Sequence, residues 1–140
     1  MQRTLGIMKP DLVSRKLEKK ALNDIESHFK NLDGFKILST KMMTLTKEQA
    51  REFYAEHREK GFFEQMVNFM TKGPVLLFVM EGENIITNYR DLIGATDPKK
   101  SDIGTLRHSY GISIDENSFH GSDAYLSALR EISFFNNLNI

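Results

Sequence analysis

Residues 117–123 of this chain, Asn-Ser-Phe-His-Gly-Ser-Asp, bring several chemically useful groups together. An imidazole, here His120, is the side chain best suited to nucleophilic or acid–base work near neutral pH. His120 ends a predicted strand at residues 118–120, Gly121 permits close backbone approach, and Ser122 and Asp123 are suited to begin a helix. The pattern predicts a reactive imidazole at a strand edge, although an ordinary strand-to-helix turn would have the same letters.

Three cations elsewhere in the sequence would suit a polyphosphate if the fold brought them together. Lys9 follows a predicted strand over residues 4–8, and Arg90 and Arg107 lie far from it along the chain. The fork of an arginine can bind two phosphate oxygens at once, and lysine supplies a compact charge. Each residue taken alone is explained as simply by a solvated surface position, so the phosphate hypothesis depends on their convergence.

The other three histidines carry no comparable signal. His28 and His57 fall on helical stretches among charged neighbours and are predicted to be solvated, while His108 lies in a long irregular connection. No two histidines have the spacing of a helical zinc site, so we expect no zinc ion held by the protein.

The composition is that of an ordinary globular protein, with 40% hydrophobic and 27% charged residues among 140, and it predicts a single domain over residues 1–140. Nineteen basic residues balance nineteen acidic ones, so no global field attracts nucleic acid or an anionic membrane. The chain has no Cys, and no apolar run reaches the length of a signal peptide or membrane span. We expect a cytoplasmic protein whose partners include neither nucleic acid nor a membrane.

Hydrophobic periodicity predicts the elements that position these residues. The pattern favours strands at residues 4–8, 35–43, 75–80 and 118–120, and helices at residues 14–29, 47–54, 62–70, 85–93 and around 125–132. The run at residues 75–80 is apolar throughout, which is typical of a central strand buried on both faces. Residues 94–117 show no dominant period, and a loop of this length is usually functional. The order predicts an α+β sandwich whose four-stranded sheet has helices on one face.

Nearly the whole chain resembles the nucleoside diphosphate kinase family in the order and spacing of its motifs. The matching motifs are Lys9-Pro10-Asp11, Phe62-Phe63, Arg90, Gly104-Thr105-Leu106-Arg107 and Asn117-x-x-His120-Gly121-Ser122-Asp123. The last of these is highly specific to the family, whereas the shorter motifs are weak signals alone. The short tail after the last helix resembles bacterial members.

The resemblance implies a ferredoxin-like α/β sandwich with a four-stranded antiparallel sheet. It also implies transfer of the γ-phosphate of a nucleoside triphosphate to a nucleoside diphosphate through a phosphohistidine at His120, with ping-pong kinetics. Exchanging one phosphoanhydride for another is nearly thermoneutral, so such an enzyme mainly has to position its substrates and stabilise charge.

The same resemblance assigns a catalytic set around His120. Glu131 matches the carboxylate that holds the imidazole, Ser122 supports it, and Lys9 and Tyr54 complete the set. Spacing alone does not bring Glu131 there, because a helix that began at Ser122 would carry it about 13 Å along the axis. A later helix start or a bent chain is therefore required.

Substrate binding is likewise assigned by resemblance. The matching residues are Lys9, Tyr54, Arg90, Thr96 and Arg107 for the phosphates, Asn117 for a ribose hydroxyl, and Phe62 with Ile114 for the two faces of the base. Aromatics at helical spacing are usually core residues, and the alternative for Phe62 or Phe63 is a place at a cleft mouth, where it would stack on a base. Stacking on a base tolerates any base, which implies broad specificity. Mg²⁺ would arrive on the nucleotide with no direct protein ligand, and Asp123 would reach it at most through water.

Several positions depart from the family pattern, namely Leu12, Gly61 and the run His108-Ser109-Tyr110. They affect the cleft lip and the anchoring of the long loop rather than the proposed nucleophile. Family members assemble as tetramers or hexamers, so the resemblance implies a homo-oligomer.

A different class of function also fits part of the sequence. A ferredoxin-like module could bind nucleotides or RNA without transferring phosphate, and Lys60-Gly61-Phe62 resembles the start of an RNA-binding strand motif. The balanced charge, the interruption of that motif by Phe63-Glu64 and the groups around His120 favour the enzyme.

Overall fold

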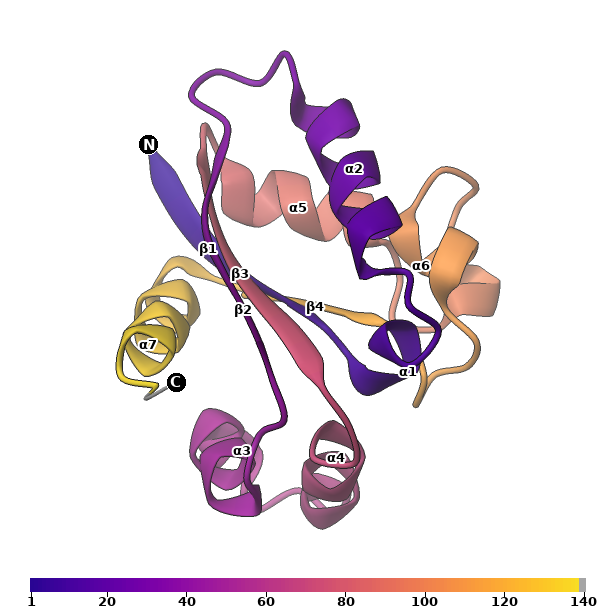
Figure 1. Cartoon of the computed structure of the whole chain (residues 1–140), viewed down its shortest axis with the longest axis vertical. Helices are drawn as coiled ribbons and strands as arrows, with labels where there is room; N and C mark the ends of the chain where they lie inside the picture. Colours follow the sequence, from indigo (N-terminus) through magenta and orange to yellow (C-terminus); the bar gives the residue numbers. More distant parts are fainter. Residues whose placement is uncertain (139–140) are drawn as a thin grey trace.

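A four-stranded antiparallel sheet forms the centre of the computed structural model, which describes residues 1–138 (Figure 1). Its strands are β1 (Gln2–Met8), β2 (Lys36–Met43), β3 (Val75–Gly82) and β4 (Phe119–Gly121). They lie in the order β2-β3-β1-β4, so β3 and β1 are central and β2 and β4 are the edges. The predicted four-stranded antiparallel sheet is confirmed.

The helices lie between and after these strands. They are α1 (Pro10–Val13), α2 (Glu18–Phe29), α3 (Lys47–Phe53), α4 (Phe63–Met70), α5 (Ile85–Ile93), α6 (Leu106–Tyr110) and α7 (Tyr125–Asn136), with short 3₁₀ turns η1 (Ala55–His57) and η2 (Pro98–Lys100). The start of α3 follows from local chemistry, because the side chains of Thr46 and Gln49 each accept a hydrogen bond from the other's backbone N–H. Within residues 1–138, no helix is long and apolar enough to span a membrane.

Helices cover both faces of the sheet, so the prediction that they cover one face is wrong (Figure 1). Helices α2, α5 and α6 pack with Phe78 and Met80 on one face, and α3, α4 and α7 pack with Leu77 and Val79 on the other. Successive strand residues point to opposite faces, so the apolar run of β3 supplies both cores. The buried central strand predicted at residues 75–80 is confirmed, and that run already required two covered faces.

The sequence-based prediction missed two short helices and misplaced the start of a third. Helix α1 begins at Pro10, whose fixed φ and absent N–H suit a first helical turn. Helix α6 lies inside the connection predicted to be irregular, and Thr105 caps it by accepting a hydrogen bond from the His108 N–H. Helix α2 begins at Glu18 rather than near residue 14, because Lys16 has a left-handed φ of 59°. Helices of one turn are too short to show a hydrophobic period.

Candidate active site

His120 lies on the edge strand β4, beside the central strand β1. His120 lies opposite Ile7 of β1, and the strand ends at Gly121. A Cβ at Gly121 would lie 2.9 Å from both Tyr89 and Ile93 of α5, so only glycine allows β4 to approach that helix so closely. The side chain of His120 is 20% exposed. The predicted imidazole at a strand edge is confirmed.

Glu131 reaches His120 because the chain turns before the last helix starts. Helix α7 begins at Tyr125, three residues after Ser122, and Glu131 is on its buried side. The Oε1 atom of Glu131 is 2.8 Å from His120 Nε2 and 2.8 Å from Ser122 Oγ. The later helix start that the sequence required is thus present, and the structure brings these three side chains together.

The hydrogen bonds around Glu131 fix which nitrogen of His120 carries the proton. Ser122 Oγ accepts from the Leu5 N–H at 3.3 Å and donates to Glu131 Oε1. An ionised carboxylate only accepts hydrogen bonds, so the Nε2 of a neutral imidazole donates to it. The lone pair is then on Nδ1, for which no hydrogen-bond partner exists among residues 1–138. Nδ1 is the nitrogen available for reaction.

Aromatic side chains hold the imidazole from another direction. The ring of buried Phe53 meets that of His120 edge to face, with centroids 5.3 Å apart. The neighbouring Tyr54 is buried and lines the cleft beside His120. Burial, together with the Glu131 carboxylate, raises the pKa of Tyr54, so its phenol stays protonated and can donate a hydrogen bond.

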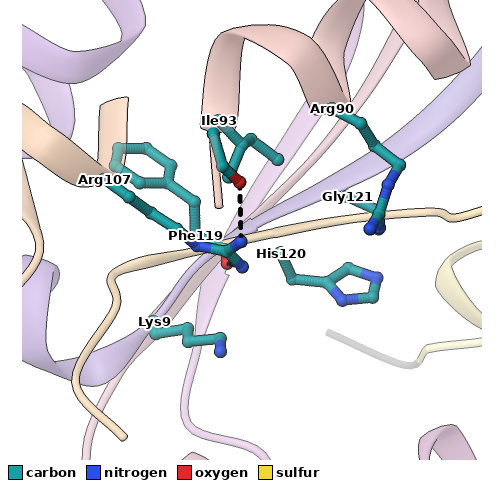
Figure 2. Close-up of a pocket in the computed structure, with 8 residues that line it drawn as sticks. Lys9, Arg90, Ile93, Arg107, Phe119, His120 and Gly121 are labelled. Carbon is teal, nitrogen blue, oxygen red and sulfur yellow. Dashed lines mark hydrogen bonds between the residues drawn. The ribbon is translucent and has the colours of Figure 1, made fainter. Parts of the chain in front are cut away.

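The three cations predicted to converge do so beside His120. Figure 2 shows Lys9, Arg90 and Arg107 around the imidazole, where they line one cavity with it. Arg107 donates to the Gly94 carbonyl at 3.2 Å and to the Phe119 carbonyl at 2.8 Å, and Arg90 donates to the Gly121 carbonyl at 3.1 Å. Phe119 and Gly121 flank His120, so main-chain oxygens of β4 hold both guanidinium groups near the imidazole.

Within residues 1–138, none of these three cations forms an ion pair with a carboxylate. Burial, and then the charge of Arg107, lowers the pKa of Lys9 to about 8. Burial lowers the pKa of Arg107 to about 10, and Arg90 contributes in the same direction. Like charges gathered in a poorly hydrated cavity favour an anionic ligand.

The cavity opens into a larger cleft of about 390 Å³. Among the residues predicted to bind substrate, Tyr54, Phe62, Thr96 and Asn117 line it together with the three cations. Phe62 is 49% exposed at the cleft, whereas Phe63 is buried in the core. The sequence allowed either a core position or a place at the cleft mouth for these two residues, and each takes one of them. Ile114 is 57% exposed and is not among the lining residues.

Asn117 links Lys9 to Thr96, and all three residues line the cleft. Its Oδ1 accepts from Lys9 Nζ at 2.8 Å, and its Nδ2 donates to the Thr96 carbonyl at 3.1 Å. Asn117 is only 3% exposed, so both ends of its amide are engaged inside the protein. The amide is held at a defined place beside Lys9.

Several cleft residues were not found by sequence reasoning. Arg130 Nε is 2.7 Å from Glu56 Oε1, which links α7 to η1, and Arg130 Nη2 is 3.8 Å from Glu131 Oε2. His57, predicted to be solvated, is instead partly buried in the cleft wall, with its ring centroid 6.2 Å from that of Phe62. The available signal was adjacency, since Glu56 and His57 follow Tyr54 closely and Arg130 precedes Glu131.

The two remaining histidines lie outside the cleft. His28 is exposed, as predicted. His108 lies on α6 rather than in an irregular loop, and its Nδ1 is 3.2 Å from the Ser101 carbonyl oxygen. Neither side chain lines the cleft around His120.

Carboxylates near the cleft fit a metal that comes with its ligand better than a metal held by the protein. Within residues 1–138, no three His, Cys, Asp or Glu side chains are grouped to hold a metal ion. Asp123 is exposed at the cleft, and a hydrogen bond from the Ser127 side chain lowers its pKa, with Arg90 acting in the same direction. The pKa shift keeps the Asp123 carboxylate anionic, and Mg²⁺ is commonly bound by one or two carboxylates together with substrate phosphates, so the residues present fit that ion.

A ferredoxin-like α/β sheet that presents an oriented imidazole to three clustered cations defines an enzyme that binds phosphates and acts on them through a histidine. The chain belongs to the nucleoside diphosphate kinase family, whose family model, described as "Nucleoside diphosphate kinase", matches residues 2–139. Members of this family transfer phosphate between nucleoside triphosphates and diphosphates by a ping-pong mechanism through a phosphohistidine, and this chain is an enzyme of that kind.

Individual relatives agree over almost the whole chain. The nucleoside diphosphate kinase of Ehrlichia canis (strain Jake) is 47% identical over 135 residues, which are 96% of this chain and 92% of that protein. The crystal structure of the Aquifex aeolicus nucleoside diphosphate kinase is 39% identical with a TM-score of 0.87, covering 96% of this chain and 94% of that one. A Babesia bovis family member is 32% identical with a TM-score of 0.88, covering 96% and 88%.

The alternative of an RNA-binding module loses its structural basis. Lys60 and Gly61 lie in the turn before α4, and Phe62 immediately precedes that helix, whereas the RNA-binding motif would require a strand. The three residues lead into the lip of the cleft instead.

Proposed function

We propose that Nδ1 of His120 is the nucleophile and attacks the γ-phosphorus of a nucleoside triphosphate. The observation that carries the proposal is the contact of Nε2 with Glu131, which leaves Nδ1 with the lone pair beside the cations. The new N–P bond forms as the bond from the γ-phosphorus to the bridging oxygen breaks. The electron pair of that bond leaves with the nucleoside diphosphate.

The second half-reaction reverses these steps with another diphosphate. A terminal phosphate oxygen of the acceptor attacks the phosphorus, and the N–P electron pair returns to Nδ1. The proton stays on Nε2 throughout, so the imidazole becomes cationic when Nδ1 is phosphorylated and neutral again when the phosphate leaves. Glu131, held by Ser122, stabilises that positive charge and keeps the ring from rotating.

We assign the phosphates to the cationic side of the cleft. Arg90 and Arg107 would bind phosphate oxygens through their forks, and Lys9 would supply a compact charge next to Nδ1. Tyr54 and Thr96, which line the same cleft, would donate further hydrogen bonds. Charge that spreads over the phosphate oxygens in the transition state is the charge these donors stabilise.

We assign the nucleoside to the outer part of the cleft. Phe62, half exposed at the mouth, would stack on the base, and Asn117 would bond a ribose hydroxyl. Ile114 lies outside the cleft lining, so it would meet the opposite face of the base only if the nucleotide extends beyond that lining. Stacking without hydrogen bonds to the base edge gives broad base specificity.

We propose that Mg²⁺ enters with the nucleotide and that Asp123 reaches it through water. The ion would neutralise phosphate charge and orient the γ-phosphate. The protein's own residues then bind and align the remaining oxygens.

We also propose that the chain forms a homo-oligomer, a tetramer or hexamer, and that it acts in the cytoplasm. Edge strand β2 exposes Leu38 and Met42, and exposed apolar edge strands are commonly covered by a partner. A chain without Cys and with balanced charge suits the cytoplasm. Light scattering of the purified protein measures the assembly.

The deciding experiment is phosphorylation by γ-labelled ATP. We expect an acid-labile, base-stable label on the protein that added nucleoside diphosphates remove. His120→Ala should abolish the label while nucleotide binding persists, and His108→Ala, which changes a histidine outside the cleft, should retain it. Folded protein that takes up no label, or a labelled His120→Ala variant, would refute the assignment.

A further inference from the structure

We infer that Ser118 is a positioning residue that holds Asn117 for the ribose of the nucleotide. The inference rests on the proposed function, which gives Asn117 its contact with a ribose hydroxyl. Ser118 is fully buried and does not line the cleft, so it acts through its neighbour in the chain.

The backbone of Ser118 has a conformation that the surrounding structure must impose. Its φ is 72°, in the left-handed region that residues other than glycine seldom adopt. The N–H of Lys9 donates to the Ser118 carbonyl at 2.8 Å. Lys9 Nζ also donates to Asn117 Oδ1 at 2.8 Å, so one lysine holds two consecutive residues by its backbone and its side chain.

The hydroxyl of Ser118 is held as firmly as its carbonyl. Its Oγ is 2.6 Å from Asp11 Oδ2, to which it donates, and it accepts from Arg15 Nη2 at 3.2 Å. Arg15 in turn donates to the Asp11 carbonyl at 2.9 Å and to the Tyr110 carbonyl at 2.6 Å. Ser118 Oγ also lies 3.2 Å from that Tyr110 oxygen. The network joins α1 to both ends of residues 110–118.

The buried carboxylate of Asp11 is stabilised by the Ser118 hydroxyl. Asp11 is 4% exposed, its Oδ1 has no hydrogen-bond partner within residues 1–138, and its Oδ2 is 3.6 Å from Arg15 Nη2. Without the Ser118 hydroxyl, a buried carboxylate would lose its short hydrogen bond, and the side chain or the segment facing it would move. Because Asn117 is the adjacent residue, the movement displaces the amide from Lys9 and Thr96.

Two variants separate this positioning from simple loss of stability. Ser118→Gly removes the hydroxyl and keeps the left-handed backbone accessible, while Asp11→Asn keeps the shape and removes the charge that receives the bond. Ser14→Ala is the matched control, because the Ser14 hydroxyl donates to the Asp11 carbonyl at 3.2 Å and does not touch Ser118. Thermal unfolding identifies the variants that fold.

The measurement compares two acceptors, a nucleoside diphosphate and its 2′,3′-dideoxy analogue. We expect the wild type to prefer the ribonucleotide in kcat/KM. Ser118→Gly and Asp11→Asn should reduce that preference roughly threefold to tenfold, which corresponds to one displaced hydrogen bond, and Ser14→Ala should leave it unchanged. A purely structural role would lower activity on both acceptors equally, so an unchanged preference in folded Ser118→Gly would overturn the inference.

Equilibrium binding of the same two diphosphates tests the inference without turnover. Loss of ribose preference in binding supports the positioning role even if the wild type fails to transfer phosphate, a failure that would concern the proposed function alone. Equal preference in wild type and Ser118→Gly in this assay contradicts the inference.

Discussion

The two sides of the His120 imidazole differ in how their charges are satisfied. On one side the Glu131 carboxylate is 5% exposed and receives hydrogen bonds from both His120 and Ser122. On the other side Arg90 and Arg107 lie against neutral main-chain oxygens, with no carboxylate paired to either within residues 1–138. The carboxylate accepts two hydrogen bonds and holds the ring, whereas the cations keep their charge for the phosphate that we propose they bind. In the proposed mechanism, the carboxylate side orients the nucleophile and the cationic side binds the substrate.

The largest effect on the reaction rate should come from reversing the direction of the hydrogen bond between His120 Nε2 and residue 131. In Glu131→Gln, the amide can donate to Nε2, which places the imidazole proton on Nδ1 and removes its lone pair. We expect the rate of His120 phosphorylation to fall about a thousandfold with nucleotide affinity nearly unchanged. Rapid-mixing measurement of the labelled protein tests this, and a rate close to wild type would show that the Glu131 contact does not set the tautomer.

On the cationic side, removing one guanidinium group should have a smaller effect on activity. Arg107→Met should lower kcat/KM about a hundredfold, because one charged donor to the phosphates is lost. Arg107→Lys should recover only part of the activity, since lysine keeps the charge and loses the paired geometry. Steady-state kinetics with both variants measures the difference. Full activity of Arg107→Lys would mean that charge alone matters at this position.

The pH dependence of binding should report Lys9. Its pKa is lowered to about 8, so the free enzyme carries this charge below pH 8 and loses it as the pH rises through that value. We expect KM for nucleotides to rise roughly threefold to tenfold between pH 7 and pH 9. Lys9→Arg, which stays charged over this range, is the control and should show a flatter profile. A profile identical in both proteins would assign the dependence to another group.

The smallest effect should come from the pair at the rim of the cleft. Arg130 and Glu56 side chains are 38% and 49% exposed, so water screens their interaction. We expect Glu56→Gln to change the free energy of unfolding by less than about 1 kcal/mol and turnover by less than about threefold. Denaturant unfolding and steady-state assays measure both. A much larger loss of turnover would indicate that the pair acts on Glu131 through Arg130.

Local patterns predicted those parts of the fold that depend on neighbours in sequence. The hydrophobic period of residues 85–93 and the apolar run of residues 75–80 each predicted an element that the structure contains. The prediction that helices cover one face was wrong because the apolar run of residues 75–80 points alternate side chains to the two faces of the sheet, and each face needs a covering layer. Helices α1 and α6 were missed because each is too short to show a hydrophobic period.

For the candidate site, the sequence predicted His120 as the reactive group and Lys9, Arg90 and Arg107 as cations that would matter only together. Their residue types and the position of His120 at the end of a strand followed from the chain alone. The tertiary structure decided that the cations meet, that Phe62 rather than Phe63 faces the cleft, and that Glu131 contacts Nε2 rather than Nδ1. These outcomes depend on the turn between Gly121 and Tyr125 and on contacts between residues about a hundred positions apart, which covalent spacing does not fix.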